Sequence, residues 1–302
     1  QMLSLFIIFL NCGINNNKDE DKTNQNLALG LVALNTVSTL NFALDSGTLK
    51  NVSCSGYISS DTVKVSGGTQ VTLKDARFYV HNINLLKSDG TKTPFSISAD
   101  GINQNSYTVN GSSYSLALLD FADTSGNCSS GLFGTATTEN KNTKITGGPV
   151  VGTFSGIEFT VGVPEDLNHQ DDTTLAAPLN SKGMYWSWNG GFKFMKIEFL
   201  NGSSTSNAWH LGSSSCTNNV CTYKNRSTVS ITKSSGTFNP SSDVIALDLQ
   251  ALLNDTDTTT SALSCHAGPQ ASDTKCEKIG TNMGLSKSSG DSSGVQTSFK
   301  IR

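Results

Sequence analysis

Residues able to bind a metal ion, or to be oxidised, gather in one part of this sequence. Trp186 and Trp188 stand two residues apart in the stretch MYWSWNGGFKF, and His169 lies shortly upstream in LNHQDD. The chain has only three tryptophans and four histidines, so this grouping asks for an explanation. Strand periodicity would place Met184, Trp186 and Trp188 on one face, which an ordinary aromatic core would also require. Periodicity alone therefore does not identify a site.

The remaining histidines are spread along the chain: His81 in FYVHNI, His210 in AWHLGSSSC and His266 in SCHAGP. Neutral imidazole is a common ligand of copper, zinc and iron, and a three-ligand site needs only two histidines and one further donor. Taken singly, each histidine is explained more simply as a structural residue. A metal site therefore needs support from elsewhere in the sequence.

Two common catalytic motifs are absent. The chain contains no phosphate-binding Gly-x-x-x-x-Gly-Lys-Ser/Thr loop and no His-Glu-x-x-His zinc motif. A metal hydrolase would have to combine His169 with Asp171 or Asp172, but adjacent carboxylates on a strand point to opposite faces. That spacing supplies neither an open metal position nor a positioned base. We therefore expect a protein that is not an enzyme.

Two further acidic residues stand within or beside apolar segments, Asp75 in LKDARFYV and Asp120 in LLDFA. A buried carboxylate needs partners that offset the loss of water. We expect structural carboxylates paired with Arg77 or with backbone donors, rather than calcium ligands.

The composition predicts an all-β protein. Charged residues make up 15% of the 302 residues, the net charge is −3, and no basic block is present, so nucleic acid is not an expected partner. Strand-like segments bounded by Gly, Asp, Asn and Ser turns occupy residues 38–44, 69–86, 113–122, 152–163, 193–200 and 227–233. In the fourth segment Ile157, Phe159, Val161 and Val163 alternate onto one face. We predict a single β-sandwich-like domain over residues 38–302.

Short helical turns complete this domain. Residues 244–255 read as a strand passing into a short helix, and residues 277–285 as another helical turn. A last strand is expected within residues 295–302, after the low-complexity stretch SKSSGDSSG. No internal repeat or Pro/Gly linker divides the folded region.

The first 12 residues resemble an export signal ending in a lipidated cysteine. The apolar run from Leu3 to Leu10 is too short to span a bilayer as a helix, and Cys12 follows it. Residues 13–37 then form a flexible tether, because the stretch from Asn15 to Asn26 is polar. The alternative is a buried first strand with a chance cysteine. We expect an exported lipoprotein, either periplasmic or on the outer membrane and cell surface, held at the membrane by its lipid.

Six cysteines remain if Cys12 is lipidated, and an even number in an exported protein indicates disulfides. The spacing favours the local pairs Cys216–Cys221 and Cys265–Cys276, which leaves Cys54 with Cys128. Other pairings stay open. A zinc site is the competing interpretation, but the chain has no Cys-x-x-Cys pair.

Several long stretches resemble the MbnP family, exported proteins found beside methanobactin systems and, with a MauG-like di-haem peroxidase, in the so-called metallo-mystery pair. These stretches are DARFYVHNINLL, LLDFADTSGNC, FTVGVPEDLNHQD, APLN, MYWSWNGGFKF, HLGSSSC, CTYKNRSTVSI, VIALDLQALL and SCHAGPQASDTKC with the later MGL. They extend over roughly residues 38 to 299. Cys216, Cys221, Cys265 and Cys276 match the four-Cys pattern for which such proteins are named.

The resemblance implies an exported copper-binding protein that acts in copper homeostasis or acquisition. In the family, a tryptophan oxidised to kynurenine joins histidines near a copper ion. Carried over to this sequence, Trp186 or Trp188 is the modified residue. His169 and His210 match the histidine ligands, and His81 matches a further position.

This implied chemistry is reasonable for copper. Opening the indole ring exposes an aryl amine and a ketone, which are donors that indole lacks. Two neutral imidazoles with one such donor suit Cu(I), whereas Cu(II) would need additional oxygen or water ligands. The chain has no Cys-x-x-Cys-His haem motif, so the oxidant must be another protein. The resemblance implies a MauG-like di-haem cytochrome c peroxidase, and an outer-membrane copper transporter is a further expected partner.

Two residues depart from the pattern that the resemblance leads us to expect. His266 directly follows Cys265, and Trp209 directly precedes His210. The sequence leaves open whether each of these residues is a metal ligand, shields the site, or is present by chance. The alternative function is a non-metal surface or adhesive β-sandwich lipoprotein, in which the Trp-x-Trp strand is core or a sugar-stacking platform. That alternative predicts unmodified tryptophan and no dependence on metal.

Overall fold

A computed structural model describes residues 37–54, 57–58, 71–122, 126–129, 131–132, 141–187, 189–201, 205–254, 256–258 and 261–302. The predicted export segment with Cys12, the tether up to residue 36, and Trp188 lie outside the described residues. The compact unit that carries the described residues spans Val37–Arg302. Within these residues no helix has the length and apolar character needed to cross a membrane.

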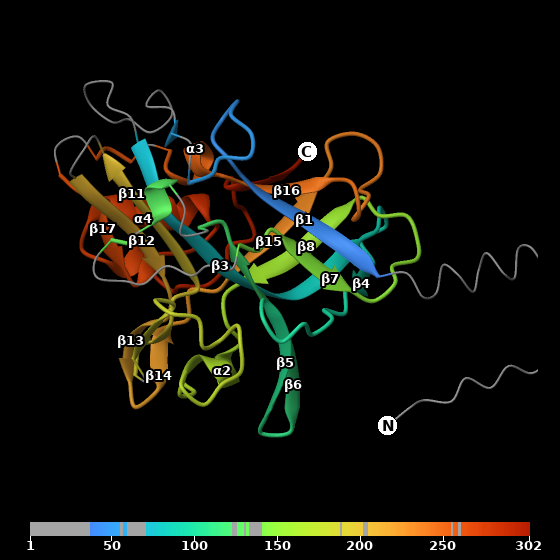
Figure 1. Ribbon diagram of the computed structural model, residues 1–302, viewed down its shortest axis with the longest axis horizontal. Coiled ribbons are helices and arrows are strands. Elements are labelled where there is room, and N and C mark those ends of the chain that lie inside the picture. The colour runs from blue at the N-terminus through green and yellow to red at the C-terminus, as the bar shows by residue number, and fades with distance from the viewer. Residues whose placement is uncertain are drawn as a thin grey trace, which may run out of the picture. The chain divides into compact units, whose positions relative to one another are not determined.

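A large sheet forms the centre of the molecule (Figure 1). In its described part the strand order is β15 (Ser227–Thr232), β8 (Gly156–Val161), β3 (Val71–Leu86), β11 (Met195–Asn201), β12 (Thr205–Leu211) and β17 (Ser264–His266). Three further strands pair with β3: β2 (Tyr57–Ile58), β4 (Lys92–Pro94) and β6 (Ser112–Asp120). The strand β6 also forms a hairpin with β5 (Gln104–Val109). The long strand β3 therefore links most of the sheet.

A smaller sheet has the order β18 (Phe299–Ile301), β16 (Val244–Asp248), β1 (Ser38–Asp45) and β7 (Lys144–Gly147). Its two central strands, β1 and β16, are parallel. Aromatic rings join the two sheets: Phe159 of β8 meets Phe42 of β1 and Phe299 of β18 edge to face, with ring centres 5.8 and 5.3 Å apart. The two sheets thus pack through a shared aromatic core, and the predicted all-β, sandwich-like fold is confirmed.

Most predicted elements are present because their patterns are strong. Ile157, Phe159 and Val161 are fully buried, as their alternation predicts. Residues 244–255 do pass from β16 into a short helix, α3 (Leu249–Leu252), which the carboxylate of Asp248 caps. The predicted helical turn at 277–285 starts earlier, as α4 (Thr274–Asn282), because the Asp273 side chain accepts a hydrogen bond from the Lys275 backbone N–H.

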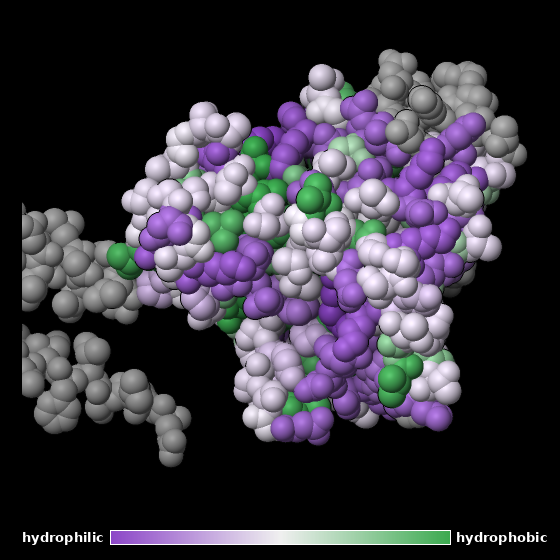
Figure 2. Space-filling model, turned by 180° about the vertical axis from the view of Figure 1, so that it is seen from behind, coloured by the Kyte–Doolittle hydropathy of each residue, from purple (hydrophilic) through white to green (hydrophobic). Residues whose placement is uncertain are grey.

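Smaller elements surround these sheets. Two hairpins pair β9 (Tyr185–Ser187) with β10 (Gly191–Phe192), and β13 (Ser214–Thr217) with β14 (Val220–Tyr223). The short helices are α2 (Glu165–Asn168), η2 (Gly126–Cys128) and η3 (Gly268–Gln270). Figure 2 shows one face of the molecule, on which hydrophilic residues dominate and hydrophobic ones form small separate groups.

Three disulfides connect the described cysteines. Cys54 is bonded to Cys128, Cys216 to Cys221 across the β13–β14 hairpin, and Cys265 of β17 to Cys276 of α4. These are the pairs that the spacing favours. Three disulfides are typical of proteins that mature in an oxidising compartment, and they indicate an extracytoplasmic protein.

Candidate metal centre

A row of polar side chains crosses the large sheet on one face. Residues paired directly across β6, β3, β11, β12 and β17 are, in order, Asp120, Arg77, Lys196, His210 and His266. Directly opposed residues point to the same side of a sheet. The first four are buried, and only His266 is exposed. The row therefore leads from the interior to the surface and ends in two neighbouring histidines.

Buried charges within this row are paired. The Arg77 guanidinium donates two hydrogen bonds to the Asp75 carboxylate, at 2.8 and 2.6 Å, and Lys196 Nζ lies 2.5 Å from the same group. Burial alone would raise the pKa of Asp75, but the charges and hydrogen bonds of Arg77 and Lys196 hold it below its ordinary value. Asp120 accepts a hydrogen bond from the Ala122 backbone N–H. Both are thus the structural carboxylates that the sequence predicts.

His210 is held by a carboxylate on the neighbouring strand. Its Nε2 lies 2.9 Å from Oε1 of Glu198, whose other oxygen accepts the backbone N–H of Leu132. Lys196 Nζ is 3.4 Å from Glu198 Oε1. Since the carboxylate is surrounded by donors, Nε2 of His210 carries the proton, and the lone pair lies on Nδ1. Burial lowers the pKa of His210 to about 4, although Glu198 opposes this shift. The imidazole is therefore neutral near pH 7.

His266 stands beside His210 because β12 and β17 pair in parallel register. The two Nδ1 atoms are 2.9 Å apart, and the rings meet edge to face with centres 4.7 Å apart. Burial also lowers the pKa of His266. Without a metal ion, one Nδ1 must donate to the other, which makes His266 the donor. Ala267, the next residue, has a left-handed φ of 99°, unusual for a residue other than glycine.

Trp186 packs against the same corner of the sheet. It belongs to β9, and its indole lies over Gly212, where a Cβ atom would come within 2.3 Å of Cζ3. The HLGS motif therefore needs its glycine to make room for this ring. Trp186 and His266 line one cavity of about 240 Å³, together with Cys216 and neighbouring backbone. The indole is partly exposed, whereas Trp209 is fully buried in the core.

A buried lysine fixes the strand that carries Trp186. Lys193 Nζ donates to the carbonyl oxygens of Gly183 and Tyr185, at 2.9 and 3.3 Å, and lies 5.5 Å from the centre of the Trp186 ring. Burial, and next the charge of Lys196, lower the pKa of Lys193 to about 8. The two carbonyl contacts hold the β9–β10 hairpin in place.

The LNH motif supports the same hairpin through its asparagine. Asn168 is fully buried, and its side-chain oxygen accepts the Phe192 backbone N–H at 3.1 Å. Gly191, at a left-handed φ of 71°, leaves no space for a Cβ beside this amide. His169 ends α2, and its Nε2 lies 3.4 Å from Cys221 Sγ. His169 thus lies against the Cys216–Cys221 disulfide and is not among the residues that line the Trp186 cavity.

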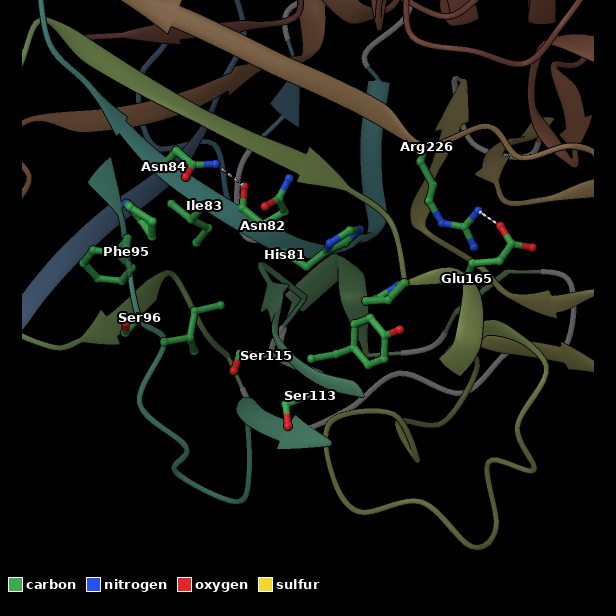
Figure 3. Close-up of a pocket in the computed structure, with 14 residues that line it drawn as sticks. His81, Asn82, Ile83, Asn84, Phe95, Ser96, Ser113, Ser115, Glu165 and Arg226 are labelled. Atoms are coloured by element: carbon green, nitrogen blue, oxygen red, sulfur yellow. Dashed lines mark hydrogen bonds and ion pairs between the residues drawn. The ribbon is translucent and has the colours of Figure 1, made fainter. Parts of the chain in front are cut away.

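Another histidine from the sequence prediction lies at a different cavity. His81 of β3 lines a hollow that also contains Glu165 and Arg226 (Figure 3). Burial, with the positive charge of Arg226 as a second cause, lowers the pKa of His81 to about 3. No other histidine or cysteine is among the described residues that line this cavity, so His81 has no second imidazole or sulfur donor beside it.

Among the described residues, the Nδ1 atoms of His210 and His266 are spaced as two ligands of one metal ion would be. Two nitrogen ligands of one ion, each about 2.0 Å from it, lie about 3 Å apart, as the two Nδ1 atoms do. His169, Cys216 and Cys221 also bring ligand atoms within 4.8 Å of one another. Those two sulfurs are bonded to each other, however, and thiolates are what metals bind.

One serine motif has no catalytic surroundings. The letters GDSSG at residues 290–294 match the Gly-x-Ser-x-Gly pattern of some hydrolases. In the structure Ser292 pairs with the backbone N–H and carbonyl of Thr228, at 3.1 and 3.3 Å. The strand-to-helix turn that the motif requires is absent at these residues, so this serine is structural.

Comparison with known proteins shows the family of this chain. A family model for MbnP matches residues 33–267, most of the chain. The chain belongs to the MbnP family. Among solved structures it is similar to MbnP from Methylosinus trichosporium, with 24% identity, a TM-score of 0.69, and coverage of 88% of this chain and 98% of that one. At this identity the similarity shows a shared fold. No curated protein matches.

The sequence alone leaves the role of His266 open, because its partner strand is distant along the chain. His210 and His266 are 56 residues apart, and only the parallel pairing of β12 with a three-residue strand brings them together. The available signal was a histidine directly after a cysteine in SCHAG. The Cys265–Cys276 disulfide anchors that strand to α4.

Proposed function

We propose that this protein binds a copper ion between Nδ1 of His210 and Nδ1 of His266, beside Trp186. The carrying observation is the 2.9 Å separation of these two nitrogens, next to a partly exposed indole. Neutral imidazoles with lone pairs on converging nitrogens are suitable donors for copper. The Glu198 carboxylate orients His210 and favours a cation at this position. Family membership supports the same metal.

Trp186 is the residue that we propose is oxidised to kynurenine. It is partly exposed and lines the cavity that contains His266, whereas Trp209 is fully buried. The indole C2–C3 bond is cleaved, and each of the two carbons becomes a carbonyl by gaining one oxygen atom from a hydrogen peroxide that is reduced to water. Hydrolysis then releases the former C2 as formate and leaves a ketone and an aryl amine. These groups would supply a donor beside the two imidazoles.

The proposed partner is a MauG-like di-haem peroxidase, since the chain itself offers no haem-attachment motif. The role of this protein is then binding, in copper homeostasis or acquisition, rather than catalysis. An exported location, with a lipid on Cys12, is part of the same proposal. The three disulfides support the oxidising compartment.

The test is peptide mass spectrometry together with metal analysis, on protein produced in a host that expresses the peroxidase. We expect the mass of kynurenine at position 186 and about one copper ion per chain. Unmodified Trp186 and no copper, with peroxidase activity demonstrated in the same cells, would favour the adhesive surface module instead.

Three histidine variants separate ligands from structural neighbours. Replacing His210 or His266 with Ala should weaken copper binding at least a hundredfold in competition with a chromophoric chelator. His169→Ala is the matched control and should change the affinity less than threefold, because that side chain lies against a disulfide. Loss of copper binding in His169→Ala, with His266→Ala unchanged, would contradict the proposed ligand pair.

A further inference from the structure

A hollow opens where β3 changes sheet partners (Figure 3). On one edge, β3 pairs with β6 as far as His81 and with β4 from Asn84 onward. On the other edge, the ladder to β8 is irregular between these residues, and Asn82 has a left-handed φ of 51°. A bulge of this kind interrupts pairing and re-aims side chains. The resulting cavity measures about 650 Å³, within the range of roughly 300–1,000 Å³ for small-molecule sites.

Two side chains on the wall of this cavity carry buried nitrogens without hydrogen bonds. Among the described residues, Nε2 of His81 and Nη2 of Arg226 are shielded from solvent and have no partner. An unpaired buried polar group is unfavourable, and native proteins contain few of them. Both nitrogens have almost no exposed surface and belong to residues that line the cavity, so a bound molecule reaches them only after these side chains turn towards it.

Arg226 is fixed on its other sides. Its Nε donates to the carbonyl oxygen of Val163 at 2.5 Å, and its Nη1 forms an ion pair with Glu165 at 2.6 Å. The guanidinium also stacks on the Phe194 ring, 4.9 Å from the ring centre. Only Nη2 is therefore left to bind a ligand. A guanidinium held in this way prefers a carboxylate to a neutral group.

The rest of the wall is apolar or weakly polar. Ile83, Phe95 and Ser96 lie on the side away from Arg226, and Ser113 and Ser115 lie between that side and Arg226 (Figure 3). The carboxylates near Arg226 are already engaged: Glu165 pairs with the guanidinium, and Asp166 accepts a hydrogen bond from the Tyr114 hydroxyl. The cavity thus has the Arg226–Glu165 ion pair at one end and the apolar side chains of Ile83 and Phe95 at the other.

We propose that this cavity binds a small carboxylic acid with a hydrocarbon body. Arg226 holds the carboxylate, His81 provides a second polar contact, and the hydrocarbon packs on Ile83 and Phe95. Binding needs side-chain rotations that expose Nη2 of Arg226 and Nε2 of His81, and such rotamer changes are common when ligands bind. The cavity shares no lining residue with the one beside Trp186. This binding activity is therefore additional to the proposed copper site.

Titration calorimetry on the full chain tests the proposal with benzoate, hexanoate, their uncharged amides benzamide and hexanamide, and inorganic phosphate. We expect each carboxylate to bind at least tenfold more tightly than its amide. Equal affinity of acid and amide, binding of phosphate alone, or no binding of either acid would overturn the proposal.

Two variants locate the binding in this cavity. Arg226→Gln should remove the preference for acid over amide. Asn84→Asp adds a negative charge to the wall at nearly constant size, and it should weaken carboxylate binding at least fivefold without affecting the amides. Asn218→Asp, the same change in the β13–β14 turn, is the control. If Arg226→Gln does not fold, Asn84→Asp decides, and unchanged carboxylate affinity in that variant would place the acid elsewhere.

Discussion

At the scale of single residues, the orientation of His210 depends on one buried carboxylate. The Glu198 carboxylate accepts a hydrogen bond from Nε2–H of His210. The lone pair that a metal ion would use is therefore on Nδ1. The sequence predicted His210 itself but not this partner. Glu198 stands in the alternating stretch KIEFL, where it reads as a solvent-facing residue of a strand. It is instead fully buried, in contact with His210, Lys196 and the backbone N–H of Leu132.

Replacing Glu198 with Gln should therefore weaken copper binding about 10- to 100-fold, since an outer carboxylate orients the imidazole and raises its basicity. Chelator competition on both proteins would measure this. Glu158→Gln is the matched control, because Glu158 of β8 forms its ion pair with the exposed Lys92 of β4. Unchanged affinity in Glu198→Gln, with His210→Ala inactive, would mean that backbone packing alone orients the imidazole.

His81 predicts a pH dependence of folding. Burial, and next the charge of Arg226, lower the pKa of His81 to about 3 from the ordinary 6.5. Between these two pH values the imidazole is protonated in the unfolded chain and neutral in the native chain. The contribution of His81 to stability is thus complete above pH 6.5 and is lost as the pH falls from 6.5 towards 3. Each pH unit in that window costs up to about 1.4 kcal/mol.

Urea unfolding at pH 7.5 and 5.5 measures this effect. The wild-type chain should lose about 1 kcal/mol more than His81→Gln between these two conditions, because glutamine does not titrate. Equal losses in both proteins would show that His81 is protonated in the native state, and that the low pKa is incorrect.

At the scale of elements, two short segments carry the candidate site and neither is stable alone. The β9–β10 hairpin brings Trp186, and the three-residue β17 brings His266. The sequence shows both as motifs, because tryptophan and cysteine are rare residues in this chain. It does not show their neighbours, since a parallel pairing such as β12–β17 leaves no local pattern.

Gly212 sets the distance between the Trp186 hairpin and β12. In Gly212→Ala the new methyl group would lie 2.3 Å from the Trp186 ring and 2.8 Å from the Phe192 carbonyl oxygen, so the hairpin must move. We expect a loss of about 1–3 kcal/mol of stability and a red-shifted tryptophan emission. Gly148→Ala is the control, because its nearest neighbour lies at 4.0 Å. An unchanged emission spectrum would mean that the indole does not occupy this position.

The Cys265–Cys276 disulfide should matter more for copper affinity than the Cys54–Cys128 disulfide does. Replacing both cysteines with Ala frees β17 from α4, and we expect copper affinity to fall at least tenfold, with a stability loss of roughly 2–3 kcal/mol. Cys54→Ala with Cys128→Ala opens a longer loop, of sequence separation 74, and should destabilise more. Copper affinity should nevertheless survive in that variant. A parallel loss of affinity in both variants would mean that the site only follows global stability.

At the scale of the whole molecule, alternating apolar residues were enough to predict a sandwich-like protein and most of its strands. The order of the strands was not predictable, because the pairings join distant parts of the chain. The small sheet shows this clearly: β1 and β18 flank β16, and Arg302 donates to the carboxylate of Asp45 across 257 positions of sequence. The first and last described strands therefore belong to the same sheet.

Phe299 is the residue through which β18 stabilises the core between the two sheets. It is only 3% exposed and meets Phe159 and Phe78 edge to face, with ring centres 5.3 and 5.7 Å away. Phe299→Ala should cost about 3–5 kcal/mol, as expected for a large aromatic removed from a packed core. Ile301→Ala, on the same strand but partly exposed, should cost clearly less. Denaturant unfolding of both variants measures the difference. Equal costs would mean that β18 contributes through backbone pairing rather than through the aromatic core that joins the two sheets.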